Sequence, residues 1–377
     1  MTGLVPQSIN EPGRREKPVV LVCPLNWGLG HAARCIPVIR EFLVAGCQVV
    51  VAAEGGPLAL LKEEFTGSVR FLLFPGMNVQ YSSGKNMVLN MAKQLPTLLY
   101  AIWQEHRQLK KILQDTSADI VLSDNRYGLW APGTQTVFMT HQVFIQSPPG
   151  LKYMEPLLYA MNRYFIKKFD HCWIPDFPGS ENLSGILSHK KELKQLRFIG
   201  PLSRFEAGSV EGTPNRTDED YILIILSGPE PQRTLLEREL TKQVDAAALK
   251  AIFVRGLING LPAPVTSLRN MLNHASSPRM KTLIAKARAV VCRPGYSTLM
   301  DLSVFGKKAV VIPTPGQTEQ EYLGRMLQEQ GFAQCVSQDQ IDLREDLKRA
   351  ERLQGIPRVS HQLGLLTAAV QDLLNQV

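Results

Sequence analysis

Short apolar runs alternate with longer amphipathic stretches along most of the chain, and this alternation limits the fold more strongly than any other feature. In the first half, apolar runs with the length of buried strands lie at residues 19–23, 47–52, 69–74, 119–123 and 136–140. In the second half, similar runs lie at residues 221–226, 250–254, 289–292 and 309–312. Strand–helix alternation is typical of parallel sheets that are covered by helices. We therefore predict an α/β protein built from two Rossmann-like, doubly wound domains.

The same pattern predicts where the domains begin and end. Residues 1–17 are polar, contain proline and lack periodicity, which indicates a flexible leader. We expect an N-terminal domain over 18–205 and a C-terminal domain over 220–358, separated by a polar linker with glycine and proline at 206–219. Apolar residues then recur at helical spacing, so 359–377 should contain a C-terminal helix that could pack back on the N-terminal domain.

Composition and charge narrow the setting in which such a chain works. No run approaches the roughly 20 apolar residues of a membrane span, and the first residues lack the apolar centre of a secretory signal. The six cysteines form no Cys-x-x-Cys pair, so we expect reduced thiols, a cytoplasmic protein and no metal site. The net charge of +8 lies mostly in the N-terminal half, which could face an anionic lipid surface, a phosphate-bearing acceptor or nucleic acid; a basic protein whose charge only keeps it soluble is the alternative. No zinc-finger or helix-turn-helix pattern supports nucleic-acid binding.

The first motif follows the first predicted strand and contains Gly28, Gly30 and His31. Glycine lets the backbone turn tightly and approach a ligand, and the N-terminus of the following helix points free N–H groups at whatever lies above it. His31 could act as a general base near neutral pH. A glycine-rich turn whose histidine has no special role is the alternative. The third glycine of the dinucleotide fingerprint is missing, so NAD binding is disfavoured.

The second motif follows the strand at 289–292, where a Pro-Gly turn leads into a helix. Gly295 ends the turn, and Ser297 and Thr298 lie in the first helical turn. Hydroxyl groups and free N–H groups at this point would form a seat for a diphosphate. Asp301, about one turn deeper, could accept hydrogen bonds from a ribose diol. An ordinary helix start with an exposed acid is the alternative.

Polar side chains also follow three further strands. Gln317, Glu319 and Gln320 come after the strand at 309–312, and their amide and carboxylate groups could bind sugar hydroxyls. Asp124 and His141 follow the strands at 119–123 and 136–140. Because ligands of open parallel sheets bind at the carboxyl ends of strands, either residue could activate an acceptor hydroxyl. A solvated helix start and a structural histidine are the alternatives.

The stretch at 87–113 combines apolar residues at helical spacing with Arg107, Lys110 and Lys111. We expect it to form a pair of helices that face the core and are broken at Pro96, because apolar helical stripes are usually buried. Contact with a membrane surface is the alternative.

Taken together, the motifs resemble the GT-B glycosyltransferases of the family-28 type, which include the N-acetylglucosaminyltransferase of lipid II synthesis. The resemblance is strongest over 280–332 and looser over 19–53 and 197–204. In that family the glycine-rich loop ends in a histidine, as at His31 here. An acid lies six residues beyond the glycine of a Cys-Arg-x-Gly segment, and Asp301 holds this position in place of Glu. Paired glutamines contact the sugar, where this chain has Gln320 and Glu321.

The resemblance implies further contacts with the donor. Arg204, in a Gly-x-x-x-Arg segment, would bind the diphosphate, for which a guanidinium is well suited. Backbone groups near Ser277 and Met280 would hold the uracil, just upstream of the Cys-Arg-x-Gly segment that contains Arg293. The family's glycine-rich turn after the first strand of the C-terminal domain corresponds to Ser227 and Gly228, where one glycine is missing and prolines intrude.

The resemblance thus implies a GT-B fold whose two domains face a cleft. It implies an enzyme that moves a hexose or N-acetylhexosamine from a UDP-sugar to an acceptor hydroxyl, with inversion and without a metal ion. The UDP-sugar is then the donor substrate, and no separate cofactor is expected. The acceptor would be lipid-linked or another cell-envelope glycan precursor, with peripheral contact at the inner face of the membrane. A UDP-sugar hydrolase or epimerase, a nucleic-acid-binding protein and a silent nucleotide-sugar binder remain as alternatives.

Overall fold

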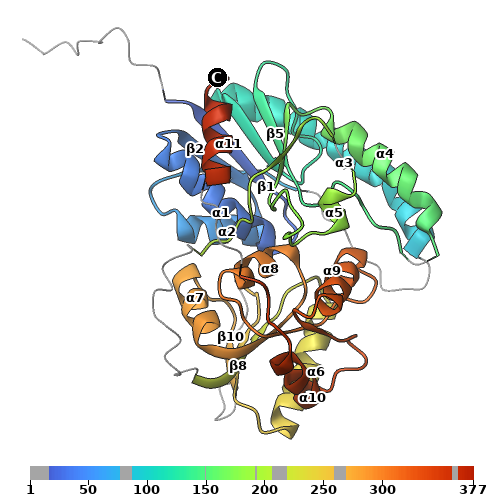
Figure 1. Ribbon diagram of the computed structural model, residues 1–377. Coiled ribbons are helices and arrows are strands. Elements are labelled where there is room, and N and C mark those ends of the chain that lie inside the picture. Colours follow the sequence, from blue (N-terminus) through green and yellow to red (C-terminus); the bar gives the residue numbers. More distant parts are fainter. Residues whose placement is uncertain are drawn as a thin grey trace, which may run out of the picture.

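The computed structural model describes residues 17–76, 87–148, 150–191, 193–205, 219–258, 269–358 and 364–377. Nearly all of the predicted leader and linker therefore lies outside the described residues. The described chain forms two parallel sheets with helices on their faces, stacked one above the other in Figure 1. The prediction of an α/β fold with two doubly wound units is confirmed.

The N-terminal sheet has seven strands in the order β3-β2-β1-β4-β5-β6-β7. All described pairs are parallel, and Asp124 at the end of β4 lies opposite Pro24 of β1 and Met139 of β5. The loops that follow these three strands therefore meet at one edge of the sheet. The strands are β1 (Val19–Pro24), β2 (Gln48–Ala53), β3 (Arg70–Leu73), β4 (Ile120–Asp124), β5 (Gln135–Met139), β6 (His171–Ile174) and β7 (Leu196–Phe198).

The C-terminal sheet has six strands in the order β10-β9-β8-β11-β12-β13, again with parallel pairing. Its central strands β8 and β11 are apolar because helices cover both faces of the sheet. The strands are β8 (Glu219–Ile225), β9 (Ala251–Val254), β10 (Arg269–Leu272), β11 (Ala287–Cys292), β12 (Ala309–Val311) and β13 (Gln334–Cys335).

Helices cover the two faces of the N-terminal sheet. One face packs against α1 (Leu29–Val44) and α2 (Gly55–Glu64), and the other against α3 (Met87–Thr116) and α4 (Glu155–Ile166). The helices of the second half and the short elements of the first half have the following bounds: η1 (Lys152–Met154), α5 (Ile186–His189), α6 (Gln232–Ala246), α7 (Ser277–Lys286), α8 (Tyr296–Ser303), α9 (Thr318–Glu329), α10 (Leu343–Arg352) and α11 (Gly364–Leu374).

The two halves share an apolar core. One cluster of buried residues runs from β1 and α1 to α8 and β11, so α1, α2 and α8 lie between the sheets (Figure 1). The last helix, α11, returns to the N-terminal half and packs on α1, where Ala369, Val370 and Leu373 are buried. Arg197 forms an ion pair of 2.7 Å with Asp372 of this helix.

Two details of the sequence prediction need correction. The short strands β6, β7, β10 and β13 were not predicted, because elements of two to four residues with few apolar side chains give too little periodicity. The stretch around Pro96 forms one continuous helix, α3, rather than a broken pair. Ile102 and Leu109 of α3 face the core, whereas Trp103 is 49% exposed, so the helix is only partly a core helix. Among the described helices, none has the length and apolar character needed to cross a membrane.

Candidate active site at the cleft between the two halves

The loop between β1 and α1 brings the start of α1 against the start of α8. Gly28 caps α1 with φ of 72°, a left-handed conformation that glycine adopts without strain. A β-carbon on Gly30 would lie 3.1 Å from Oγ of Ser297 in α8, so only glycine allows this close approach without displacing Ser297. The N-termini of α1 and α8, both of which carry partial positive charge, therefore meet at the same cleft.

A buried polar cluster surrounds the first turn of α1. Nδ1 of His31 lies 2.9 Å from Oδ2 of Asp124, and Nε of Arg34 donates to Oδ1 of the same carboxylate at 2.9 Å. Arg34 also contacts Oδ1 through its Nη2 atom. The side chain of Asp124 is fully buried, whereas 16% of the His31 side chain is exposed. The predicted residues His31 and Asp124 thus form one pair, and His31 is the member that solvent or a ligand can reach.

His141 extends this cluster across the cleft to the C-terminal half. Its Nδ1 accepts a hydrogen bond of 3.0 Å from Nη1 of Arg34, and its Nε2 lies 2.7 Å from Oε1 of Glu319 in α9. Its ring stacks on Tyr296, the first residue of α8, with ring centroids 4.2 Å apart. Gln142 donates to the second carboxylate oxygen of Glu319. Two predicted residues from opposite halves, His141 and Glu319, are therefore direct partners.

The charges within the cluster determine its protonation. Burial lowers the pKa of His31, and the Arg34 cation lowers it further, whereas Asp124 acts in the opposite direction. Burial opposes ionisation of Asp124, but Arg34 and His31 outweigh it and hold the pKa of Asp124 below its usual value. For Glu319, His141 and Arg34 likewise outweigh burial and lower the pKa. Near neutral pH, the cluster therefore holds a neutral His31 beside two ionised carboxylates.

Asp301 of α8 pairs with the end of the N-terminal half. Its Oδ1 accepts from the hydroxyl of Ser203 at 2.9 Å, and its Oδ2 accepts from Nε of Arg204 at 3.0 Å. Burial raises the pKa of Asp301, and Arg204 partly offsets this effect. Arg204, which was predicted to bind the diphosphate, and Asp301, which was predicted to bind the ribose, thus contact each other. This contact places Arg204 beside α8.

Around the start of α8, the structure leaves several of the predicted donor residues partly accessible. Gly295 caps the helix without a side-chain hydrogen bond, and Ser297 and Thr298 in its first turn are half-buried. Gly228 follows β8 with φ of 103° and is exposed, and its neighbour Ser227 is half-buried. These groups lie at the carboxyl ends of β8 and β11, as the fold requires for a ligand site.

The predicted contacts of Arg293 and Gln320 are not supported, because their side chains already serve the protein. Arg293 is fully buried, donates to the carbonyl oxygens of Ile312 and Pro313, and donates to Gln338 at 2.6 Å. Gln320 accepts from the backbone N–H of Thr314 at 2.8 Å and holds the loop after β12. The hydroxyl of Ser277 donates to Glu64 at 2.8 Å and Met280 lies in the core, but the contact predicted near them involves backbone groups and stays a prediction.

Gln317 is the N-cap residue of α9 and is half-buried, and its contact with a sugar hydroxyl stays a prediction.

Sequence reasoning missed four residues of this site: Arg34, Gln142, Tyr296 and Thr314. Arg34 lies three residues after His31, a spacing that places both on one face of a helix, so the sequence held a signal for it. Thr314 is buried, and its hydroxyl oxygen has no hydrogen-bond partner among the described residues. A β-carbon on Gly228 would lie 3.6 Å from that oxygen, so Thr314 faces the loop after β8. No local pattern could have shown this.

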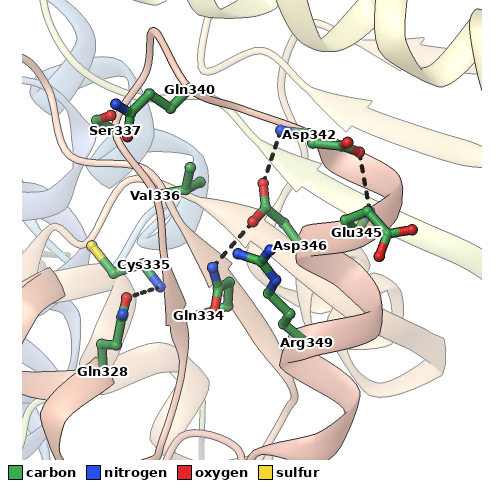
Figure 2. Close-up of a pocket in the computed structure, with 10 residues that line it drawn as sticks. All are labelled: Gln328, Gln334, Cys335, Val336, Ser337, Gln340, Asp342, Glu345, Asp346 and Arg349. Atoms are coloured by element: carbon green, nitrogen blue, oxygen red, sulfur yellow. Dashed lines mark hydrogen bonds between the residues drawn. The ribbon is translucent and has the colours of Figure 1, made fainter.

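A polar pocket of about 400 Å³ lies outside the cleft, between the end of β13 and α10 (Figure 2). Its polar groups largely pair with one another. Asp346 accepts from Gln334 at 3.1 Å and from the backbone N–H of Asp342 at 3.0 Å, and Gln328 accepts from the N–H of Cys335. We therefore interpret these contacts as a structural network that fixes the edge of the sheet.

Comparisons with known proteins agree with this geometry. The glycosyltransferase family 28 C-terminal domain matches residues 266–353. A glycosyltransferase of Methanosarcina acetivorans is 25% identical over 326 residues, which cover 82% of this chain and 81% of the relative. A UDP-N-acetylglucosamine--N-acetylmuramyl-(pentapeptide) pyrophosphoryl-undecaprenol N-acetylglucosamine transferase of Nocardia farcinica is 31% identical over 144 residues, 37% of each chain. The calicheamicin glycosyltransferase CalG4 shares the fold, with a TM-score of 0.63 and 14% identity over 96% of this chain and 100% of CalG4.

Two parallel sheets of Rossmann-like order in one chain, together with these matches, define a GT-B glycosyltransferase. Within that class, the resemblance to the family-28 type that was inferred from the motifs is confirmed.

Proposed function

We propose that this glycosyltransferase moves a hexose or N-acetylhexosamine from a UDP-sugar to an acceptor hydroxyl, with inversion at the anomeric carbon. The observation that carries the proposal is the meeting of the α1 and α8 N-termini beside the His31–Asp124 pair. A helix N-terminus suits a diphosphate, and a neutral histidine suits deprotonation of a hydroxyl. The printed name of the Nocardia relative specifies a UDP-sugar donor, which supports the choice of nucleotide.

In the proposed reaction, the acceptor hydroxyl attacks the anomeric carbon while the bond from that carbon to the UDP oxygen breaks. The proposal takes His31 in the tautomer with its proton on Nδ1, the atom that lies 2.9 Å from Oδ2 of Asp124, so that Nε2 can take the proton of the acceptor. UDP leaves with the bonding electron pair. The N-terminus of α8 and the neighbouring Arg204 stabilise the negative charge that develops on the leaving group, so the proposal requires no metal ion and no cofactor beyond the donor.

On the sugar side, Glu319 is the strongest candidate for a contact with sugar hydroxyls. It lies in the first turn of α9, is only partly buried and carries a charge near neutral pH because its pKa is lowered. An ionised carboxylate accepts hydrogen bonds from hydroxyl groups more strongly than a neutral amide does. Gln317 and the Ser227–Gly228 loop would complete this side of the donor site.

The surface of α3 and α4 suggests where the acceptor approaches. We define the α3–α4 surface by its exposed apolar residues: Leu99, Tyr100 and Trp103 of α3, and Leu157 and Tyr164 of α4. Trp130 joins the two helices, since its ring stacks on His106 of α3 at 4.0 Å and lies 4.5 Å from Nζ of Lys168. Exposed cations flank the surface: Arg107, Lys110, Lys111, Arg163 and Lys167.

Aromatic side chains with flanking cations suit an anionic membrane surface. We therefore propose that the protein works in the cytoplasm, with peripheral contact at the inner face of the membrane and a lipid-linked or other cell-envelope glycan acceptor. Binding to vesicles of anionic phospholipid tests this part. Trp103→Asp should reduce binding several-fold, whereas Leu235→Asp, at an exposed apolar residue of α6, should leave it unchanged. Equal binding by both variants would contradict the assignment.

Turnover assays test the transfer reaction itself. UDP release from UDP-hexoses and UDP-N-acetylhexosamines would be followed with and without soluble and lipid-linked acceptors. We expect release to depend on both the donor and an acceptor, and His31→Ala to lower kcat by about 100-fold or more. Release at the same rate without any acceptor would indicate a UDP-sugar hydrolase instead. Full activity of His31→Ala would refute the role of the His31–Asp124 pair.

A further inference from the structure

Arg34 is the charged residue at the centre of the cluster, although the transfer reaction as proposed above gives it no role. Its side chain is 1% exposed and lies one helical turn after His31 in α1. A buried guanidinium carries a full charge and can only donate hydrogen bonds. Arg34 donates to Asp124 through two atoms and to His141 through a third. It therefore contacts every titratable residue that we predicted on the acceptor side.

These contacts fix the tautomer of His141. Because Arg34 cannot accept, Nδ1 of His141 must accept its hydrogen bond, and a neutral ring then carries its proton on Nε2. That proton points to Oε1 of Glu319 at 2.7 Å. The same chain of hydrogen bonds therefore connects Asp124 in the N-terminal half, through Arg34 and His141, to the proposed sugar contact in the C-terminal half.

Arg34 also opposes protonation of His31. Nη2 of Arg34 lies 3.0 Å from Nδ1 of His31, so an imidazolium would place two cations in contact. Unlike Nδ1 of His141, this nitrogen also has a carboxylate beside it, Oδ2 of Asp124 at 2.9 Å, and our proposal assigns its proton to that bond. The other titratable or charged groups facing His31 are Asp124 of β4, His141 after β5, Glu319 of α9 and, stacked on His141, Tyr296 of α8. Burial raises the pKa of Tyr296 well above its usual value, so this phenol stays neutral. Arg34 is thus the permanent cation of the cluster.

We propose that Arg34 is a positioning residue of the transfer reaction, which holds Asp124 and His141 in the orientation that lets Nε2 of His31 accept the acceptor proton. The inference rests on the proposed function for its kinetic consequences. The tautomer of His141, however, follows from the hydrogen bonds alone and can be measured in the absence of any reaction.

The kinetic test compares Arg34→Gln and Arg34→Lys with the wild type across a range of pH. In Arg34→Gln the cation is removed, and the acidic limb of the kcat/KM profile should move to higher pH by about one unit or more, because Asp124 then stabilises the imidazolium of His31 without opposition. Arg34→Lys keeps the charge, so its acidic limb should stay near that of the wild type, with a lower kcat because one ammonium cannot reach both partners.

Arg126→Gln is the matched control. Arg126 is also a buried arginine, paired with Glu105 at 2.9 Å and lying over the ring of Phe74, but it has no contact with His31 or Asp124. The Arg126→Gln variant should therefore be less stable than the wild type, but the acidic limb of its kcat/KM profile should not shift. The proposal would be overturned if the acidic limb of the kcat/KM profile lay at the same pH in Arg34→Gln as in the wild type and in Arg126→Gln.

A second measurement covers the case in which Arg34→Gln fails to fold. NMR of the full chain with ¹⁵N-labelled histidine reports the tautomer of each ring directly. In the wild type we expect the neutral ring of His141 to be the Nε2–H tautomer, with Arg34→Lys showing a mixture. A wild-type Nδ1–H tautomer for His141 would overturn the inference even if the enzyme is an active transferase. Conversely, the expected tautomer in a protein without transferase activity would refute the proposed function and leave the positioning geometry intact.

Discussion

Replacement of Asp124 by asparagine is the perturbation for which the structure gives the clearest energetic expectation. Asp124 is fully buried and is the only carboxylate that Arg34 contacts among the described residues. Asparagine keeps the shape but removes the charge, which leaves the Arg34 cation buried without its counterion. Breaking a buried pair in this way costs about 3–5 kcal/mol of unfolding free energy. For a unit of this size, each kcal/mol of lost unfolding free energy lowers the melting temperature by about 2–4 °C, so we expect the melting temperature to fall by about 6–20 °C.

Thermal unfolding of the full chain measures this effect. Asp115→Asn, at an exposed carboxylate of α3, is the control and should change the unfolding free energy by less than about 0.5 kcal/mol. The double variant Asp124→Leu with Arg34→Met removes both charges and should recover part of the loss, because a buried charge is then no longer unpaired. A melting temperature of Asp124→Asn within 2 °C of that of Asp115→Asn would correspond to a loss of only about 0.5–1 kcal/mol of unfolding free energy. This result would show that the buried ion pair is not the stabilising feature that we describe.

Three further substitutions test other parts of the structure. In Gly185→Ala the new β-carbon would lie 2.0 Å from Oη of Tyr322, so the contact between the halves should weaken by about 1–3 kcal/mol in denaturant titrations; unchanged stability would contradict this packing. Glu319→Gln removes the charge next to His141 and should raise KM for the donor about tenfold, and an unchanged KM would exclude Glu319 from the donor site. Asp342→Ala removes the N-cap of α10, so stability should fall by about 1 kcal/mol while donor affinity is retained; weakened donor binding would mean that α10 contributes to the site.

The architecture could be predicted because it depends on local patterns. The runs at 19–23 and 289–292, which lie in β1 and β11, are continuous and apolar, since both faces of each sheet are covered, and this signal is visible in four or five residues. The alternation of strands and helices also predicted that His31 and Ser297 follow the carboxyl ends of strands. In the structure both residues lie where the start of α1 meets the start of α8. β7, with three half-buried residues, carries no such signal.

The partners within the site could not be predicted, because they depend on where distant segments meet. Arg293 and Arg204 both lie in segments that resemble motifs of the family, and no local pattern distinguishes the role of one from that of the other. In the structure, Arg293 is enclosed by the carbonyl oxygens of its own sheet, whereas Arg204 reaches α8 from the other half. The pairing of His141 with Glu319 joins residues 178 positions apart, and only the packing of the two halves determines it.

Nucleotide binding at the start of α8 tests the central claim most directly. A ligand that binds only the folded chain stabilises it by about 2.7 kcal/mol at a concentration 100 times its Kd, which corresponds to several degrees of melting temperature. We predict that UDP and UDP-sugars raise the melting temperature, that Ser297→Asp abolishes the increase by placing a negative charge beside the diphosphate, and that Ser337→Asp, in the pocket of Figure 2, preserves it. An increase that survives in Ser297→Asp, or an equal increase with NAD, would contradict a diphosphate seated on α8.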